Sequence, residues 1–330
     1  YMSNLPPIEV PQGAIRLNTD SQKLEFFAQD RWYEMATNTP NLDGGGRGIA
    51  AGGLTPGQSD VLEYITIPTA GNSIDFGNLS AATQDQPGCT GSSTRGLIGG
   101  GKRGSSTTDA IDFITFSSTG NGTDYGDLSS GRRQIAGTGN QTRGVFSGGE
   151  APSHVNVIDF MTIASTGNAV DYGDLSVARR IANAASSPTR AVIMGGFASP
   201  ASLNSIEFLT ISTTGNGQDF GDLTVARYLQ NGSVSSSTRA VAMGGNTAPT
   251  AVNTIDYVTI ATLGNAMNFG DLTETNYSAQ SVSDSIRGVR MGGVTPLDTS
   301  CDYINIATEG NAVFFGSLLT THKEGGGLSN

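Results

Sequence analysis

One motif occurs six times in this chain, and its period limits the possible folds more than any other feature. An Arg is followed five and six residues later by two glycines, and successive copies of this Arg lie 47 to 49 residues apart. The six arginines are Arg47, Arg95, Arg143, Arg190, Arg239 and Arg287. A fixed period of this length indicates similar structural units that pack on one another and share their cores.

Each copy of the repeat predicts short β-strands and no helix. Behind the glycine pair comes a variable stretch, and then an alternating run such as 158–163 that is rich in β-branched and aromatic residues. Every run ends in a Gly-Asn pair, such as Gly167 and Asn168, which predicts a two-residue hairpin turn. An acidic-aromatic-glycine triplet such as 171–173 marks the returning strand, and a fourth apolar stretch such as 175–182 completes the unit.

The count of units predicts the architecture. Four antiparallel strands in a unit of about 40 to 50 residues are typical of a β-propeller blade. We therefore expect an all-β protein with a small β module at 1–40 and a six-bladed propeller at 41–330. The blades are expected at 41–79 together with 318–330, then at 80–128, 129–175, 176–223, 224–272 and 273–317. In this scheme the segment 319–328 pairs into the first blade and removes a free sheet edge.

The residues that recur in every unit are interpreted as structural. Each repeated Arg is expected to pair with the acidic residue of the third strand and with backbone carbonyls between strands, because a forked guanidinium suits this role better than Lys. The glycine pairs are expected at bulges or close backbone approaches. Aromatic residues on adjacent strands, such as Phe160 and Tyr172, are expected to fill the space between blades.

The order of these elements, as in 175–227, resembles the kelch repeat. The usual blade Trp is absent, and its place is taken by Phe76, Tyr125, Tyr172, Phe220, Phe269 and Phe315. This version of the repeat, with Ser/Thr-Gly-Asn-x-x-Asp-Phe/Tyr-Gly-Asp-Leu, resembles that of structural proteins of tailed bacteriophages, especially those that infect marine cyanobacteria. The resemblance implies a location in the virion, on its exterior.

The N-terminal stretch 13–35 is similar to a short β module of phage fibre and adhesin proteins. About 40 residues provide little core, so an apolar face is expected to pack on the particle, on a copy of the module or on the propeller. The first two possibilities would make it an anchor to other virion proteins. Its predicted anchoring residues are Ile15, Leu17, Phe26 and Trp32.

Catalytic and cofactor motifs are absent from the sequence, and we expect neither enzyme activity, nor a cofactor, nor a bound metal. His154 and His322 have no companion ligands at metal-binding spacing. The stretch 96–102 approaches a phosphate-binding loop, but Arg103 replaces the Ser or Thr that would contact magnesium. The formal charge of −11 argues against nucleic-acid binding, and the apolar runs are too short to cross a membrane.

The stretches that differ between units predict the binding surface. They follow the glycine pairs, are expected on one end of the propeller, and span 54–61, 102–110, 150–156, 197–204, 246–253 and 294–300. Loops on a rigid scaffold commonly carry recognition, although such loops also serve as solvated connectors. The candidate ligand-binding residues are Lys102, Arg103, His154, Phe197 and Thr295.

The sequence favours a non-enzymatic virion protein that attaches to a host-surface glycan or receptor, or decorates the particle. An internal structural hub of the virion is the alternative, and a glycan depolymerase is a third hypothesis. Association of the chain with copies of itself is left open.

Overall fold

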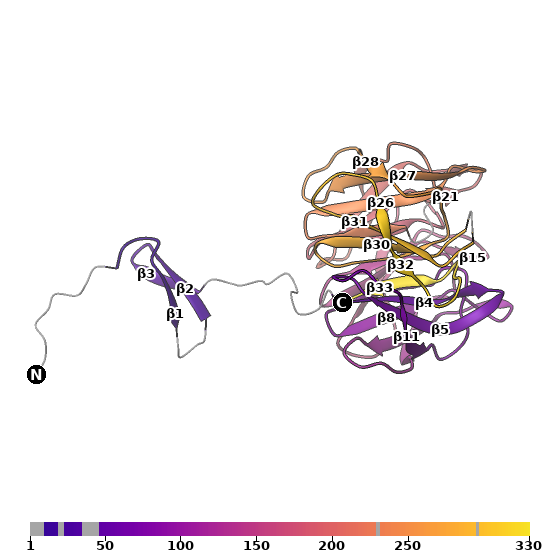
Figure 1. Ribbon diagram of the computed structural model, residues 1–330, viewed down its shortest axis with the longest axis horizontal. Helices are drawn as coiled ribbons and strands as arrows, with labels where there is room; N and C mark the ends of the chain where they lie inside the picture. Colours follow the sequence, from indigo (N-terminus) through magenta and orange to yellow (C-terminus); the bar gives the residue numbers. More distant parts are fainter. Residues whose placement is uncertain (1–9, 19–22, 35–45, 229–231, 295–296) are drawn as a thin grey trace, which may run out of the picture. The chain divides into compact units, whose positions relative to one another are not determined.

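The structure is a computed structural model that describes residues 10–18, 23–34, 46–228, 232–294 and 297–330. These residues form strands and turns without a helix, so the all-β prediction is confirmed. None of them belongs to a helix that could cross a membrane. The chain separates into two compact units, Tyr1–Pro40 and Asn41–Asn330 (Figure 1), and each is described by itself.

The first unit contains a three-stranded antiparallel sheet. Its strands are β1 (Ile15–Asn18), β2 (Lys23–Ala28) and β3 (Arg31–Glu34), with β2 in the middle. The register pairs Ile15 with Phe26 and Phe26 with Tyr33. Because directly paired residues point to the same face of a sheet, this register separates the apolar residues of the unit into two sets.

The second unit contains six four-stranded antiparallel sheets among its described residues. In spatial order, sheet 1 is β33 (Gly326–Ser329), β4 (Arg47–Thr55), β5 (Gly57–Thr66) and β6 (Ile74–Asn78); sheet 2 is β7 (Gly88–Gly91), β8 (Arg95–Gly99), β11 (Ala110–Thr115) and β12 (Thr123–Asp127); sheet 3 is β13 (Ala136–Gly139), β14 (Arg143–Ser147), β17 (Val157–Thr162) and β18 (Val170–Asp174). Sheet 4 is β19 (Asn183–Ser186), β20 (Arg190–Met194), β23 (Ser205–Thr210) and β24 (Gln218–Asp222); sheet 5 is β25 (Ser233–Ser235), β26 (Arg239–Asn246), β27 (Ala251–Thr259) and β28 (Met267–Asp271); sheet 6 is β29 (Gln280–Ser283), β30 (Arg287–Met291), β31 (Ser300–Asn305) and β32 (Val313–Ser317).

Successive sheets share their cores. Each of five apolar clusters combines buried residues of two sheets that follow one another in the order 1 to 6. The remaining pair of sheets shares one as well, because Met291 and Phe315 of sheet 6 pack with Ala50 and Ile65 of sheet 1. The first strands follow the same order, with β7 against β13, β13 against β19, β19 against β25, β25 against β29, β29 against β33, and β33 against β7.

The repeated Arg donates to backbone carbonyls of the neighbouring sheet, so its predicted carbonyl contacts are confirmed and its predicted pairing with the acidic residue is wrong. Arg143 of β14 lies with Cζ 4.6 Å from the ring centroid of Phe160, and it donates a hydrogen bond of 3.0 Å to the carbonyl of Ile211 beyond β23. The register explains the difference, because Arg143 lies opposite Thr162, whereas Asp159 lies three positions further along the strand. The equivalent donor and acceptor pairs are Arg47 and Phe116, Arg95 and Ile163, Arg190 and Ile260, Arg239 and Ile306, and Arg287 and Ile67.

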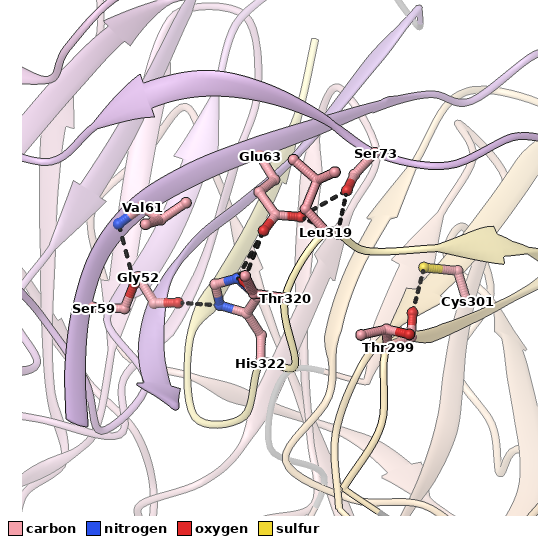
Figure 2. Close-up of polar contacts among 10 residues, drawn as sticks. All are labelled: Gly52, Ser59, Val61, Glu63, Ser73, Thr299, Cys301, Leu319, Thr320 and His322. Atoms are coloured by element: carbon pink, nitrogen blue, oxygen red, sulfur yellow. Dashed lines mark hydrogen bonds and ion pairs between the residues drawn. The ribbon is translucent and has the colours of Figure 1, made fainter. Parts of the chain in front are cut away.

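A different basic side chain lies beside each buried carboxylate. Arg132, on the segment that enters sheet 3, lies 2.9 Å from Asp159. The corresponding pairs are Arg179 with Glu207, Arg227 with Asp256, and His322 with Glu63 (Figure 2). Two sheets have Thr83 or Asn276 at this position, and there the cation comes from within the sheet, as Arg103 with Asp112 and Arg290 with Asp302.

The Gly-Asn pairs do not form the two-residue hairpins that we predicted. Residues 163–169 connect β17 to β18, so the connection is seven residues long. Gly167 N donates to the carbonyl of Tyr125, and Asn168 Oδ1 accepts from the N–H of Asp127, both on β12 of the preceding sheet. The other five sheets repeat the Asn contact. The connection therefore covers the outer edge of the neighbouring sheet, which protects it from unwanted strand pairing.

Candidate binding face

Short hairpins follow the glycine pairs and bear most of the predicted recognition residues. They are β9 (Lys102–Arg103) with β10 (Ser106–Thr107), β15 (Glu150–Ala151) with β16 (Ser153–His154), and β21 (Phe197–Ala198) with β22 (Ala201–Ser202). In sheets 1 and 5 the same segments lengthen the pairs β4–β5 and β26–β27. Gly148 begins one hairpin with a φ of 62°, and a Cβ there would lie 2.6 Å from the carbonyl of Arg179. The glycine pair thus permits the close approach that we predicted.

One position recurs before each sheet and is occupied by Thr83, Arg132, Arg179, Arg227, Asn276 and His322. The residue that follows this position forms a backbone bridge to the next hairpin segment in five of the six cases. Arg133 forms an isolated β-bridge with Glu150, and Arg180 forms one with Phe197. Gln84, Tyr228 and Tyr277 form the same bridge with Lys102, Asn246 and Val294. These backbone bridges fix the hairpins of sheets 2 to 5 and the segment at Val294 in sheet 6, so side chains at equivalent positions lie side by side. We call this surface the hairpin face, and Figure 1 shows β15 and β21 at the same end of the sheets.

Four aromatic rings follow one another across the hairpin face. The ring centroids are 5.8 Å apart for His154 and Phe197, 6.3 Å for Phe197 and Tyr228, and 6.4 Å for Tyr228 and Tyr277, each in edge-to-face geometry. Arg180 Cζ lies 5.4 Å from the ring centroid of Phe197. The sequence pointed to His154 and Phe197 but missed both tyrosines. The available signal was their position directly after Arg227 and Asn276.

A network of charged side chains borders the aromatic series. Glu150 accepts from Arg133 at 2.8 Å and pairs with Arg180 at 3.0 Å, and Arg133 also contacts Asp85 at 2.6 Å. The hydrogen bonds to Glu150 and then Asp85 raise the pKa of Arg133 above its usual value. The network therefore holds the guanidinium groups of Arg133 and Arg180 in place at the rim of the hairpin face.

The lowered pKa of His154 predicts a neutral ring at pH 7. Burial and then the charge of Arg180 lower its pKa, although Glu150 opposes this effect. Its Nδ1 accepts from the N–H of Ser199 at 3.4 Å, which leaves the proton of the neutral ring on Nε2. The ring offers a flat surface and one hydrogen-bond donor.

Two cavities open beside these residues. The first has a volume of about 650 Å³ between the hairpins of sheets 2 and 3, and its lining includes Lys102, Arg133 and Glu150. The second, of about 630 Å³, lies between the hairpins of sheets 3 and 4, and its lining includes His154, Arg180, Phe197 and again Glu150. Cavities with a few convergent polar groups are the usual form of a ligand site.

The structure separates the predicted ligand-binding residues into two groups. Lys102, His154 and Phe197 line the cavities. Arg103 turns inward instead, where its Nη2 lies 3.1 Å from the buried carboxylate of Asp112 and its Nη1 donates to Ser80. Thr295 lies outside the described residues. No group of three metal-binding side chains occurs among the residues that the structure describes.

The predicted anchoring residues occupy both faces of the first unit. Ile15, Leu17 and Phe26 share one face and are 64%, 60% and 37% exposed. Trp32 lies on the other face, where its ring has Arg16 Cζ at 4.1 Å and the ring of Phe27 at 5.3 Å. The exposed apolar face therefore includes the first three residues together with Leu24, and not Trp32.

The chain matches no protein-family model and no curated protein.

Proposed function

We propose that the protein is a non-enzymatic structural component of a tailed-bacteriophage virion that contacts the host surface through its hairpin face. The observation that carries this proposal is the fixed array of aromatic rings, paired charges and two cavities on one surface. Aromatic faces with planar charged groups suit sugars and polar proteins alike, because they combine apolar stacking with directional hydrogen bonds. The phage-like repeat and N-terminal module support the location in a virion.

We infer further that the six sheets are the blades of a kelch-like propeller. The cyclic order of contacts among the first strands supports this arrangement, as does the apolar cluster shared by sheets 6 and 1. So does the antiparallel pairing of β33 with β4, which joins the end of the chain to the first sheet. An electron-microscopy map of the particle tests it, and a linear stack of sheets would contradict it.

The exposed face of the first unit supports an anchoring role. Ile15 and Leu17 leave most of their side-chain surface exposed, which a three-stranded sheet of this size cannot bury by itself. Deletion of residues 1–40 should abolish incorporation into particles while the second unit still folds. Incorporation of the truncated protein at normal copy number would contradict the anchor.

A glycan depolymerase remains the weaker hypothesis. Glycosidases hold two carboxyl groups about 5 to 9.5 Å apart, with room for the sugar between them. Here Glu324 is hydrogen-bonded to Asp85, and Glu274 is hydrogen-bonded to Asp298. Burial first and the neighbouring carboxylate second raise the pKa of both glutamates, but neither pair leaves space for a glycosidic bond.

An adsorption assay with host cells tests the proposed attachment. Purified protein should bind host cells and should compete with intact particles for adsorption, while the envelope polysaccharide keeps its length after incubation. Shortened polysaccharide would support the depolymerase. The internal-hub alternative predicts no binding to cells, together with burial of the hairpin face by other subunits in the particle.

A further inference from the structure

The two cavities of the hairpin face differ in chemistry although they share a wall. The formal charge of the chain is −11, yet the two linings together contain Lys102, Arg133 and Arg180 against the single carboxylate of Glu150. Asp85 offsets one of these cations from outside the linings. Against the acidic background of the molecule, this surface is locally cationic and favours an anionic group.

The first cavity is suited to a charged, oxygen-rich group. The amine of Lys102 and the guanidinium of Arg133 reach it together with hydroxyl groups of Ser105, Ser106 and Thr107. Its lining contains no aromatic residue. A carboxylated sugar offers both a charge for the cations and hydroxyl groups for the serines and threonine.

The second cavity is suited to a less polar ring. His154 and Phe197 contribute flat surfaces, and Val177 adds an aliphatic one. Arg180 contributes a guanidinium that is 27% exposed and is held in place by Glu150 and Gln134, and His154 contributes the N–H of its ring. Such a site can accept the apolar face of a pyranose and bind one of its hydroxyl groups.

The hairpin of β15 and β16 forms the wall between the two cavities. Glu150 and Pro152 belong to both linings, so a ligand that fills both must cross this hairpin. Two neighbouring sites of similar volume, about 650 and 630 Å³, fit a polymer of similar-sized units better than one compact molecule.

We propose that the cavities are consecutive subsites for an acidic polysaccharide, with a uronate sugar in the first and a neutral pyranose in the second. This inference rests on the proposed attachment function and names the class of glycan that the hairpin face selects.

Calorimetry with the full chain and two defined probes tests the proposal. The acidic probe is a tetrasaccharide of alternating glucuronate and N-acetylglucosamine, and the neutral probe is its carboxyl-reduced form. The acidic probe should bind at least about tenfold more tightly, the factor expected for one hydrogen bond to a charged group. Equal affinity for both probes would overturn the acidic subsite, and no binding of the acidic probe would overturn the whole inference.

Two variants separate the subsites. Lys102→Ala should weaken binding of the acidic probe about tenfold and leave the neutral probe unchanged. Phe197→Ala should weaken both probes by similar factors, because the neutral pyranose is common to them. Phe197→Ala with unchanged affinities would overturn the second subsite.

A matched control removes the same charge elsewhere. Lys323 occupies the position after His322 that corresponds to Arg133 and Arg180, but it lines neither cavity. Lys323→Ala should leave both affinities within twofold of the unmodified protein, and a loss equal to that of Lys102→Ala would show a general charge effect and overturn the proposal. The two claims fail in different ways. If the proposed attachment function is wrong, the protein does not adsorb to host cells; if only the acidic-polysaccharide subsites are wrong, it still adsorbs but does not prefer the acidic probe.

Discussion

The imidazole of His322 contacts the buried carboxylate of Glu63, although the two residues lie far apart in the sequence of the second unit (Figure 2). Nε2 lies 3.2 Å from a carboxylate oxygen of Glu63, and Nδ1 lies 2.9 Å from the carbonyl oxygen of Gly52. The two side chains are at most 1% exposed. In sheets 3 to 5 an Arg takes this position, so sheet 1 differs from them in placing an imidazole beside its buried carboxylate.

Replacement of His322 by Ala should destabilise the protein. It removes one hydrogen-bond contact to the buried carboxylate of Glu63, which costs about 1.5–3 kcal/mol, and hydrogen bonds from Ser73 and Thr320 place the result at the lower end. Urea unfolding at pH 7 measures the effect. His154→Ala is the control and should change the free energy of unfolding by less than about 0.5 kcal/mol. A loss below 1 kcal/mol for His322→Ala would refute the role of the pair.

Glu63 should contribute stability above pH 4.5 and lose it in acid. Burial opposes its ionisation, but hydrogen bonds from His322, Ser73, the N–H of Leu319 and Thr320 lower its pKa from the usual 4.5 to about 2. Since the folded state binds this proton less tightly, the contribution reaches about 3 kcal/mol at neutral pH and disappears as the pH falls through 2.

Unfolding of Glu63→Gln between pH 7 and pH 2 tests this dependence. The difference from the unmodified protein should shrink steadily below pH 4.5. Substitution of the exposed Asp75 by Asn should give a small difference that does not follow this course. A constant difference for Glu63→Gln would contradict the prediction.

Arg143→Ala should weaken the contact between sheets 3 and 4. It removes the stacking on Phe160 and the hydrogen bond to Ile211, which together amount to about 1–3 kcal/mol. Arg143→Lys keeps the charge but loses the planar group, so it should recover only part of the stability. Full recovery in thermal unfolding would show that the guanidinium geometry is unimportant.

Arg103→Ala should lower stability and spare ligand binding, the reverse of Lys102→Ala. Asp112 would lose its cation while Ser80 still binds it, so the expected loss is about 2–3 kcal/mol. Thermal unfolding and calorimetry with the acidic tetrasaccharide measure the two properties. Reduced affinity with unchanged stability would assign Arg103 to the binding surface after all.

Gly137→Ala should be among the most damaging small substitutions. A Cβ at Gly137 would overlap the backbone of Cys89 on β7, and such overpacking costs about 1–3 kcal/mol or more. Gly120 provides the control, because a Cβ there meets no atom within 4 Å. Gly120→Ala should leave the melting temperature unchanged or slightly higher, and similar losses for both variants would contradict the packing argument.

The repeat predicted the strands well because every copy keeps an alternating run rich in β-branched residues, and the copies keep a nearly constant spacing. It did not predict which groups pair, since Arg143 and Asp159 recur equally often but their spacing in the register was unknown. The seven-residue connection at 163–169 was missed because Gly and Asn also serve in contacts between sheets, which a local turn rule does not consider.

The candidate site was predicted in part. Lys102, His154 and Phe197 were recognisable because their segments vary between units. Tyr228 and Tyr277 occur on segments that looked structural, and only folding brings them into the series that begins at His154. Arg103 resembled a surface cation because nothing in the sequence shows that Thr83 leaves Asp112 without its usual partner.

Because β33 pairs with β4, sheet 1 can be completed only after β33 has been synthesised. β4 ends at Thr55, whereas its partner strand β33 begins only at Gly326. One side of sheet 1 therefore stays unpaired while sheets 2 to 6 are synthesised. Residues 326–329 therefore complete sheet 1 late in synthesis, and a chain truncated before Gly326 exposes the unpaired edge of β4 to pairing with other chains.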